Sequence, residues 1–540
     1  MSDYSFDCGC RFKVLDATQD PPRVEFSGKI EDINLECSRT WKLLSNGNTK
    51  GCFQLESRLG QMMSKKLKPT NIEQLSALIS ILRPGCLDAI RDGKSISNHY
   101  IDKKNGEESI DYYHSCLTDI LGQTYGEMIY QEQAMQITQK VAGFDLQEAD
   151  MLRKAIGKKK PEEMAKIKKK FLDGSKNLNL VTEKESEEIF SWIEKSQRYS
   201  FNASHAVSYA INAYLSAYAK AHFPKIFFAA YLRFAKDKID PQQEIKELVR
   251  NASEMDIEVC IPDFRNLNEL FILKNKSIYF GLTDIKGVGS SVFNKIQLII
   301  KDHDVDAMSW YEVLYTVLLN INSTASKALI SCGSLDYLKK DRTEMLFEYE
   351  TCCSLTKKEL EYFGQIIKGD TSGGLIKILQ DVLIIGKINK NRRIIFDNLI
   401  QSIKNPPYSL SDKVEWLADS ESGLLGTAIT CSRLDSYDIS MTNTNCKEFK
   451  KSVIASNIII VGEISNTNVV KTKTGKNPGQ EMAFITIEDQ YGLLDSVVFF
   501  PDQYEKYKDH LFIGNVLIFT GSKSKTKDGL IVDKCFIPRS

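Results

Sequence analysis

The chain has 540 residues, with 71 Lys and Arg balanced by 71 Asp and Glu. This length is too great for one ordinary domain and predicts about three or four. The balanced charge excludes binding to nucleic acid through overall charge, so any such attraction must come from local basic patches.

The thirteen cysteines follow no repeated spacing. An odd number of cysteines without a leader peptide fits a reducing cytosol better than a disulfide scaffold, and we expect most of them to be buried thiols. The polar N-terminus has no apolar signal core, and no stretch approaches the length of a membrane span. We therefore expect a cytoplasmic protein with no membrane partner.

Residues 1–50 carry few periodic signals, and we treat them as a separate N-terminal segment. Its Cys8-Gly9-Cys10 suggests zinc, but the spacing differs from the usual one and no matching Cys or His pair lies nearby in the sequence. Cys37 and Cys52 are possible but distant partners. The sequence therefore predicts no metal site.

Residues 51–235 have the apolar spacing of a helical domain. Pro84 follows the first clear helix, and Pro224 ends or kinks the last one. That last helix is rich in Ala and Tyr, which permits close packing and suggests a central position. The predicted helices span 71–82, 131–142, 183–195 and 202–223.

A basic run lies at a joint between two of these helices. From Arg153 to Lys170 there are nine Lys and Arg against two Glu, with Gly157 breaking the run and Pro161 suited to a helix start. Arg153 and Lys154 end one helix, and Lys158, Lys159 and Lys160 open the next. A solvated lysine-rich face is the plain alternative. Cations that flank a joint favour a phosphate-binding site.

The start of the central helix, Asn202-Ala203-Ser204-His205, has two interpretations. Asn202 or Ser204 can cap the helix, with His205 a polar residue in its first turn. Alternatively, Asn202 and His205 face a nucleotide whose phosphates lie at the helix N-terminus. Residue chemistry alone leaves both open.

Residues 236–345 contain short strands and a turn, Lys286-Gly287-Val288-Gly289, followed by a helix over 290–300. Glycines let backbone amides approach a DNA phosphate, so the pattern predicts a helix-hairpin-helix in which Lys286, Gly287 and Gly289 bind DNA. A second turn over 332–336 supports a paired hairpin. Residues 346–450 have weak periodicity with Gly373-Gly374 and Pro406-Pro407, and we predict a poorly defined connector with some helix.

Residues 451–540 alternate between apolar and polar positions, which predicts the strands of a small barrel of the OB-fold type. Such barrels bind single strands by stacking and charge. Lys471, Lys473 and Lys476 on one loop, and Lys523, Lys525 and Lys527 on another, would supply the charge. An inert packing module is the alternative.

Several catalytic motifs are missing from the sequence. We find no Walker loop, no dinucleotide fingerprint and no Ser/His/Asp constellation that spacing supports. Metal-dependent nucleotidyl transfer needs closely placed carboxylates to hold cations, and no Asp-x-Asp occurs where a catalytic strand is expected.

Taken together, several motifs resemble the bacterial DNA polymerase III alpha subunit, the C-family replicative polymerase, from about residue 30 to residue 345. The motifs are Cys52-Phe53-Gln54-Leu55-Glu56-Ser57, Leu82-Arg83-Pro84-Gly85, the stretch 125–133, Glu148-Ala149-Asp150, the stretch 199–209, Ile261-Pro262-Asp263 and the stretch 280–289. Cys86 stands where the family usually has Pro, and Ala203 where it usually has Lys, which puts fine contacts at these positions in doubt.

The resemblance implies a multi-domain, mainly α protein with helical fingers (51–235), a helix-hairpin-helix region (236–345) and a C-terminal OB-fold barrel (451–540). It places Arg153 and Lys154 near the triphosphate of the incoming dNTP, and Asn202, Ser204 and His205 close to the nucleotide. Lys158 to Lys160 would face solvent or the template backbone. The implied partners are primer–template DNA, dNTPs and a sliding clamp, for which 380–384 is a faint candidate peptide.

In this family the PHP domain, the palm with its Pro-Asp-x-Asp-x-Asp-Phe motif and the thumb precede the Phe-Gln-Leu-Glu-Ser stretch. Only about fifty residues precede it here. A third palm carboxylate lies in a Lys-Phe-Asp-x-Leu-Gly context, which Phe6-Asp7-Cys8-Gly9 matches poorly, and Asp7 is the one remaining catalytic candidate. Mg²⁺ would thus be held mainly by carboxylates outside this chain.

Our first hypothesis is a DNA-directed DNA polymerase split in two, in which a separate polypeptide supplies PHP domain and palm. The alternatives are a non-catalytic DNA-binding accessory derived from a polymerase, or a truncated gene product without function. The many Lys, Ile and Asn residues are compatible with a phage origin.

Overall fold

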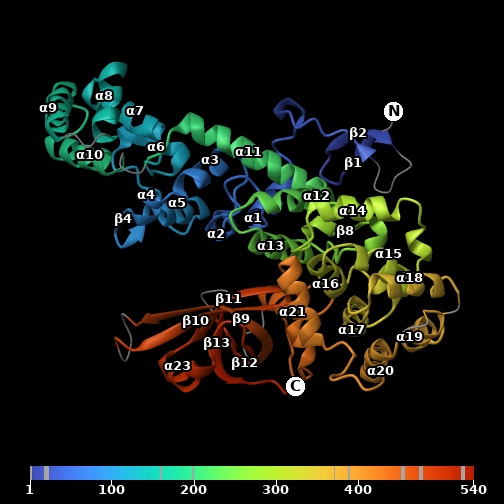
Figure 1. The fold of residues 1–540 in the computed structure, drawn as a ribbon. Coiled ribbons are helices and arrows are strands. Elements are labelled where there is room, and N and C mark those ends of the chain that lie inside the picture. Colours follow the sequence, from blue (N-terminus) through green and yellow to red (C-terminus); the bar gives the residue numbers. More distant parts are fainter. Residues whose placement is uncertain are drawn as a thin grey trace. The chain divides into compact units, whose positions relative to one another are not determined.

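A computed structural model describes residues 3–16, 23–157, 161–196, 200–369, 371–386, 389–451, 457–472, 478–524 and 529–539. The chain forms two compact units, Met1–Pro224 and Lys225–Ser540 (Figure 1). Each unit is taken by itself below. No helix among the described residues is long and apolar enough to cross a membrane.

The first unit is mainly helical, as the sequence predicted. Its strands pair only locally, in the three-stranded antiparallel sheet β1-β2-β3 and the hairpin β4-β5. The strands are β1 Asp3–Ser5, β2 Arg11–Asp16, β3 Arg23–Val24, β4 Ile90–Arg91 and β5 Lys94–Ser95. The helices are α1 Ser38–Ser45, α2 Arg58–Leu67, α3 Ile72–Ile81, α4 Pro84–Asp88, α5 Ile96–Asn105, α6 Thr118–Leu121, α7 Gln131–Ala142, α8 Leu146–Gly157, α9 Pro161–Leu178, α10 Glu183–Ser196 and α11 Ala203–His222.

The long helix α11 runs through the first unit and begins directly after its N-cap residue, Asn202 (Figure 1). It packs against α3 and α1. The face that makes these contacts is built from small residues with no exposed surface, which lets neighbouring helices approach closely. They are Ala206, Ala210, Ala213 and Ala217. The sequence prediction of a closely packed central helix is confirmed.

Helices α7 to α10 form their own hydrophobic cluster, centred on Ile137, Phe171 and Phe190. At the contact between α7 and α9 the chain has Gly174, where a Cβ atom would lie 2.1 Å from the carbonyl oxygen of Ala142. Only glycine fits at this crossing. The basic helix α9 therefore packs closely on α7 at this crossing.

The second unit combines helices, a small mixed sheet and a barrel. In the sheet, β8 pairs with β6 in parallel and with β7 in antiparallel fashion. The helices are α12 Pro224–Phe234, α13 Pro241–Glu254, α14 Ser290–Ile300, α15 Trp310–Thr316, α16 Ser323–Ser331, α17 Arg342–Cys353, α18 Lys357–Ile366, α19 Gly374–Ile385, α20 Lys390–Lys404, α21 Val414–Leu425, α22 Cys446–Lys451 and α23 Pro501–Tyr507. The strands are β6 Val259–Cys260, β7 Ile272–Lys274, β8 Ser277–Tyr279, β9 Ile458–Lys471, β10 Glu481–Asp489, β11 Gly492–Phe499, β12 Val516–Lys523 and β13 Leu530–Phe536.

Residues 346–450 are not a poorly defined connector, and that prediction was wrong. Most of α17, all of α18 to α21 and all but the last residue of α22 lie here, and Phe363, Leu379 and Phe396 are fully buried in the same core as the hairpin region. The periodicity is weak because these helices do not all bury a single apolar stripe. Helix α17, for example, also buries Arg342 and Glu348.

The C-terminal barrel is closed, with strand order β10-β11-β13-β12-β9. Strands β11 and β13 pair in parallel at Val497 and Leu530, and α23 lies between β11 and β12 in sequence. A closed five-stranded barrel with this arrangement is the OB-fold that the sequence predicted. Its interior is filled by alternating apolar residues, among them Ile460, Ile485 and Phe519.

Candidate nucleotide and nucleic-acid interface

The N-termini of α7 and α11 meet and are tied together by main-chain bonds. The amide of Gln131 donates to the carbonyl of Phe201 at 2.9 Å, and the amide of Phe201 donates to the carbonyl of Ile129 at 3.0 Å. The positive ends of two helix dipoles therefore lie next to one another, which makes the junction attractive to anions.

Within this junction Asn202 caps α11 and is braced by Glu132. The Asn202 Oδ1 accepts from the amide of His205 at 2.9 Å, while its Nδ2 donates to Glu132 at 2.6 Å. Glu132 also accepts from the amide of Ala203 at 2.9 Å. The capping interpretation of Asn202 is thus confirmed. Its exposed neighbours Ser204 and His205 remain accessible to a ligand.

A row of rings extends from this junction along α11. The Arg83 guanidinium lies 3.9 Å from the ring centroid of Phe201, and the His205 ring lies 5.3 Å from Phe201 and 4.1 Å from Tyr209. Tyr209 in turn meets Phe53 at 5.2 Å, edge to face. The row presents π faces and one cation, which is the chemistry that stacks a nucleobase.

Arg83 has spare hydrogen-bonding capacity in this row. Its Nε atom is buried, with no hydrogen-bond partner among the residues that the structure describes. A buried donor of this kind costs free energy unless a ligand or water satisfies it. Arg83 is therefore a candidate ligand-binding residue.

Arg153 and Lys154 lie in the last turns of α8 and share one carboxylate. Asp150 accepts from Arg153 at 2.8 Å and from Lys154 at 2.6 Å, and the hydrogen bonds from Lys154 and Arg153 lower the pKa of Asp150. The Lys154 side chain remains 58% exposed. Among the described residues, no hydrogen bond or ion pair joins this group to Asn202, Ser204 or His205. The two parts of the predicted dNTP site are each present but are not in contact.

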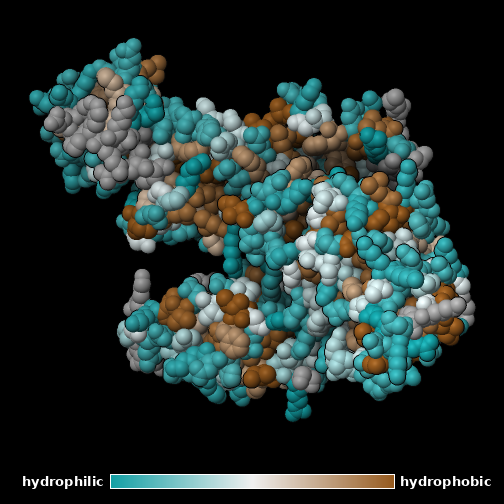
Figure 2. Space-filling view, viewed as in Figure 1, coloured by the Kyte–Doolittle hydropathy of each residue, from teal (hydrophilic) through white to brown (hydrophobic). Residues whose placement is uncertain are grey.

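More cations lie on the neighbouring helix α9. Lys166, Lys169 and Lys170 line an open hollow of about 390 Å³ with Asp173 and the tight crossing at Gly174. Lys170 also pairs with Glu148. Hydrophilic residues dominate the visible face of this part of the chain (Figure 2). Lys158, Lys159 and Lys160 lie outside the described residues.

In the second unit, the hairpin before α14 exposes its glycine-rich turn. Gly287 has a φ of +96°, and Lys286, Gly287 and Gly289 are all exposed. Within the described part of the chain, the amides of Gly287 and Gly289 make no hydrogen bond. Free amides beside an exposed lysine are suited to a phosphate group.

The second predicted turn is not available in this way. Cys332, Gly333, Ser334 and Leu335 are buried, and the amide of Phe264 donates to the carbonyl of Ser334 at 2.9 Å. The Arg342 side chain covers Gly333, so that a Cβ atom there would lie 2.2 Å from it. This turn stabilises the fold and does not face a ligand.

On the barrel, Phe484 of β10 lies opposite Val498 of β11, and both are half-buried on the outer face. Lys471 is exposed at the end of β9, whereas Lys523 turns inward and donates to the carbonyl of Phe449 at 2.9 Å. Phe484 is thus a candidate for the stacking residue that the sequence did not identify. Lys473, Lys476, Lys525 and Lys527 fall outside the described residues.

Comparison with known proteins identifies the three parts independently. Residues 13–179 match the bacterial DNA polymerase III alpha subunit finger domain, 256–345 a helix-hairpin-helix motif, and 458–537 an OB-fold nucleic acid binding domain. DNA polymerase III subunit alpha of Aquifex aeolicus is 31% identical over 502 residues, or 91% of this chain and 38% of the relative. That of Borreliella burgdorferi is 30% identical over 94% of this chain and 42% of the relative.

Over nine tenths of its own length, the chain is similar to the DNA polymerase III alpha subunit. The protein of Vibrio cholerae with that name is 29% identical over 93% of this chain and 42% of its own length. The chain thus spans about two fifths of the length of the curated relatives it matches. The resemblance stated on the sequence is confirmed, together with the finger, hairpin and barrel domains.

Sequence reasoning did not single out five residues of the ring row and the helix junction. They are Phe53, Arg83, Glu132, Phe201 and Tyr209. All lie within or beside the motifs that carried the resemblance. Their signal was present in the sequence, but only the fold shows that they meet.

The structure also places two other candidates from the sequence, the possible catalytic residue Asp7 and the possible clamp peptide 380–384. Asp7 is exposed and lies 3.3 Å from the guanidinium of Arg39. The faint clamp peptide 380–384 lies inside α19, where Val382 is fully buried, so it is not an exposed extended peptide.

The part of the chain that the structure describes brings no group of three or more carboxylates close enough together to hold Mg²⁺. Among the described residues, the one group of three or more possible metal ligands is Cys8, Cys10, Cys37 and His222. This thiol-rich group does not fit Mg²⁺, which prefers oxygen ligands. The prediction that this chain has no metal site conflicts with this geometry, because the fold brings Cys37 and His222 to the Cys8-Gly9-Cys10 turn.

Proposed function

We propose that this chain supplies the surfaces of a DNA-directed DNA polymerase that bind the incoming dNTP and the primer–template. The observation that carries the proposal is the row formed by Arg83, Phe201, His205 and Tyr209 at the joined N-termini of α7 and α11. Residues from separate sequence motifs converge there, and the row is open to solvent, since His205 is exposed and Arg83, Phe201 and Tyr209 are only half-buried.

In this proposal the base and sugar of the dNTP lie along that row, and the anionic end reaches Arg153 and Lys154. When the dNTP binds, Arg153 and Lys154 would exchange their ion pairs with Asp150 for ion pairs with the triphosphate. Asn202 would act by holding the first turn of α11 in place. Ser204 and His205 would then contact the nucleotide directly.

The hairpin and the barrel would bind DNA at separate places. Lys286, Gly287 and Gly289 would contact a duplex phosphate, and Phe484 with Lys471 would bind a single strand. Both sets of contacts are expected to depend on salt, because they neutralise phosphates.

We further propose that the carboxylates that hold Mg²⁺ come from a palm outside these 540 residues. The Pro-Asp-x-Asp-x-Asp-Phe motif does not occur in the sequence. A separate PHP- and palm-bearing polypeptide is the source that we expect.

Binding of a fluorescent dNTP in the presence of a primer–template tests the nucleotide part. Arg153→Ala or Lys154→Ala should weaken binding about tenfold or more, because a charge-assisted bond is lost. Lys140→Ala is the matched control, since Lys140 also pairs with a single aspartate, Asp119, on the same group of helices. If the chain binds DNA but neither variant changes its affinity for the dNTP, the accessory-protein alternative would be favoured.

A further inference from the structure

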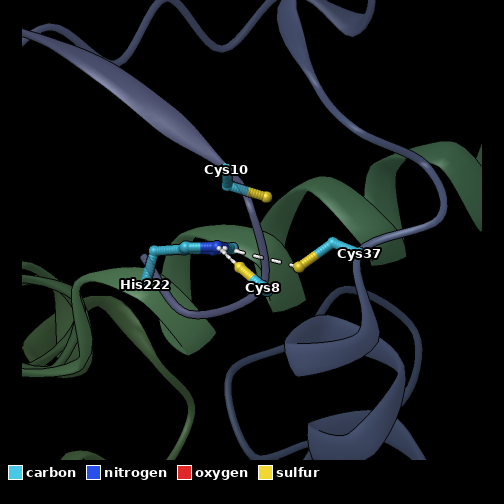
Figure 3. Close-up of side chains that lie close together, drawn as sticks. All are labelled: Cys8, Cys10, Cys37 and His222. Atoms are coloured by element: carbon cyan, nitrogen blue, oxygen red, sulfur yellow. Dashed lines mark hydrogen bonds between the residues drawn. The ribbon is translucent and has the colours of Figure 1, made fainter. Parts of the chain in front are cut away.

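Four potential metal ligands converge within the first unit. The Nε2 atom of His222 lies 3.4 Å from the Cys8 Sγ and 3.7 Å from the Cys37 Sγ, and Cys10 completes the group (Figure 3). All the donor atoms lie within 4.8 Å of one another.

Three separate elements deliver these side chains. Cys8 and Cys10 flank Gly9, whose φ of +81° closes the tight turn between β1 and β2. Cys37 is the residue before the first turn of α1, and His222 is the last residue of α11. The sequence could not suggest the group, because Cys8 and His222 are 214 residues apart.

The hydrogen bond made by the other His222 nitrogen fixes the ring for metal binding. Its Nδ1 donates to the carbonyl oxygen of Tyr218 at 2.9 Å. The proton is therefore on Nδ1, and the lone pair of Nε2 points to the sulfur atoms. A histidine ligand held through its second nitrogen by a backbone carbonyl is the usual arrangement in metal sites.

The distances fit a tetrahedral ion. With Zn–S near 2.3 Å and Zn–N near 2.05 Å, a tetrahedral angle separates sulfur and nitrogen by about 3.6 Å. The two Nε2–Sγ distances, 3.4 and 3.7 Å, lie on either side of this value. Three thiolates and one imidazole are the ligands that select zinc, and they leave no position open for a substrate.

The surroundings are those of a structural site. Cys37 has no exposed surface, and Cys10 and His222 are 4% exposed. The rings of Phe6 and Phe12 lie 4.8 and 5.4 Å from the His222 ring. This small aromatic layer joins the short β1-β2 hairpin to α11, but the hairpin has little other core of its own.

We propose that Cys8, Cys10, Cys37 and His222 bind one Zn²⁺ ion, which fastens the N-terminal segment to the end of α11. Binding releases the thiol protons and couples the folding of the β1-β2 hairpin and the start of α1 to metal. The site is independent of the dNTP site. It gives the N-terminal segment a structural role at the end of the helix whose other end carries Asn202 and His205.

Metal analysis of the full chain, purified under reducing conditions, tests the proposal. We expect one zinc per chain. Cys8→Ser and His222→Ala should lose it, whereas Cys116→Ser, which alters a half-buried cysteine elsewhere in the unit, should keep it. His222→Cys is the second variant, since a fourth thiolate should restore zinc even where His222→Ala folds poorly.

Cobalt replacement adds a spectroscopic test. Cobalt bound in the same place should show the intense visible bands of a tetrahedral ion and a thiolate charge-transfer band, both absent from Cys8→Ser. A folded chain without bound zinc, or zinc retained in both Cys8→Ser and His222→Ala, would overturn the proposal.

Discussion

The side chains of Glu132 and Asn202 are joined by a hydrogen bond of 2.6 Å, in which the Asn202 Nδ2 donates to the Glu132 carboxylate. Because Glu132 also accepts from the amide of Ala203, one carboxylate bridges the starts of α7 and α11. The proposed nucleotide-binding surface is thus organised by Glu132, a residue that the sequence did not single out as a site residue.

Glu132→Ala should lower the free energy of unfolding by about 1.5–3 kcal/mol, because two hydrogen bonds to a charged group are lost. Urea denaturation of the chain measures this. Glu187→Ala, which removes an exposed carboxylate on α10, is the control and should change stability little. Equal effects of the two substitutions would show that the bridge does not stabilise the junction.

Asp284 should make the stability of the second unit depend on pH. Burial raises its pKa from 3.8 to about 7, although the amide of Gly281 and the charges of Lys236 and Arg233 act in the opposite direction. Between these pH values the folded chain keeps a proton that the unfolded chain has released. Stability therefore falls as pH rises from about 4 to about 7, by up to about 4 kcal/mol, and then levels off.

Asp284→Asn should remove most of this fall and be more stable than the parent chain at pH 8. The asparagine side chain can still accept from the amide of Gly281, which donates to Asp284 at 2.9 Å. Unfolding followed at pH 5 and pH 8 tests this, with the exposed Asp306→Asn as control. An unchanged pH profile in Asp284→Asn would contradict the assignment.

Arg342→Ala should destabilise the second unit by about 3–5 kcal/mol, since the buried Glu421 carboxylate loses its cation and keeps only hydrogen bonds from Ile429 and Thr430. The two side chains lie 2.9 Å apart, and Glu421 has no exposed surface. Arg433→Ala breaks an exposed pair with Asp419 and should cost at most about 1 kcal/mol. Denaturation that gives the two variants the same midpoint would mean that 346–450 is not part of the core.

Phe484→Ala should weaken binding of single-stranded DNA by about 1–3 kcal/mol, the usual value of one stacked base. Fluorescence anisotropy with a labelled oligonucleotide measures it. Tyr491→Ala is the control, because Tyr491 is exposed in the β10–β11 turn and away from the Phe484–Val498 pair. Loss of affinity in the control alone would place the stacking surface elsewhere on the barrel.

Helices, strands and caps could be predicted from the sequence more reliably than the tertiary contacts between them. The cap at Asn202, the end of α11 before Pro224 and the alternating barrel strands follow from local rules of residue chemistry. The row from Arg83 to Tyr209 and the group around His222 depend on tertiary packing, which brings distant segments together. For 346–450 the sequence predicted only some helix in a poorly defined connector. Helix α17 is buried on several sides, which removes the periodic pattern there, and the packing of the later helices into a common core depends on tertiary contacts.

Primer extension tests the central claim most directly. The chain should add no nucleotide to a primer–template by itself, with Mg²⁺ and dNTPs, and should do so when mixed with a purified polypeptide that carries the PHP domain and the Pro-Asp-x-Asp-x-Asp-Phe palm. Arg153→Ala with Lys154→Ala should lower the rate of the mixture, whereas Lys140→Ala should not. Robust extension by the chain alone would contradict the account. So would a mixture that extends the primer at the same rate with Arg153→Ala and Lys154→Ala as with the parent chain.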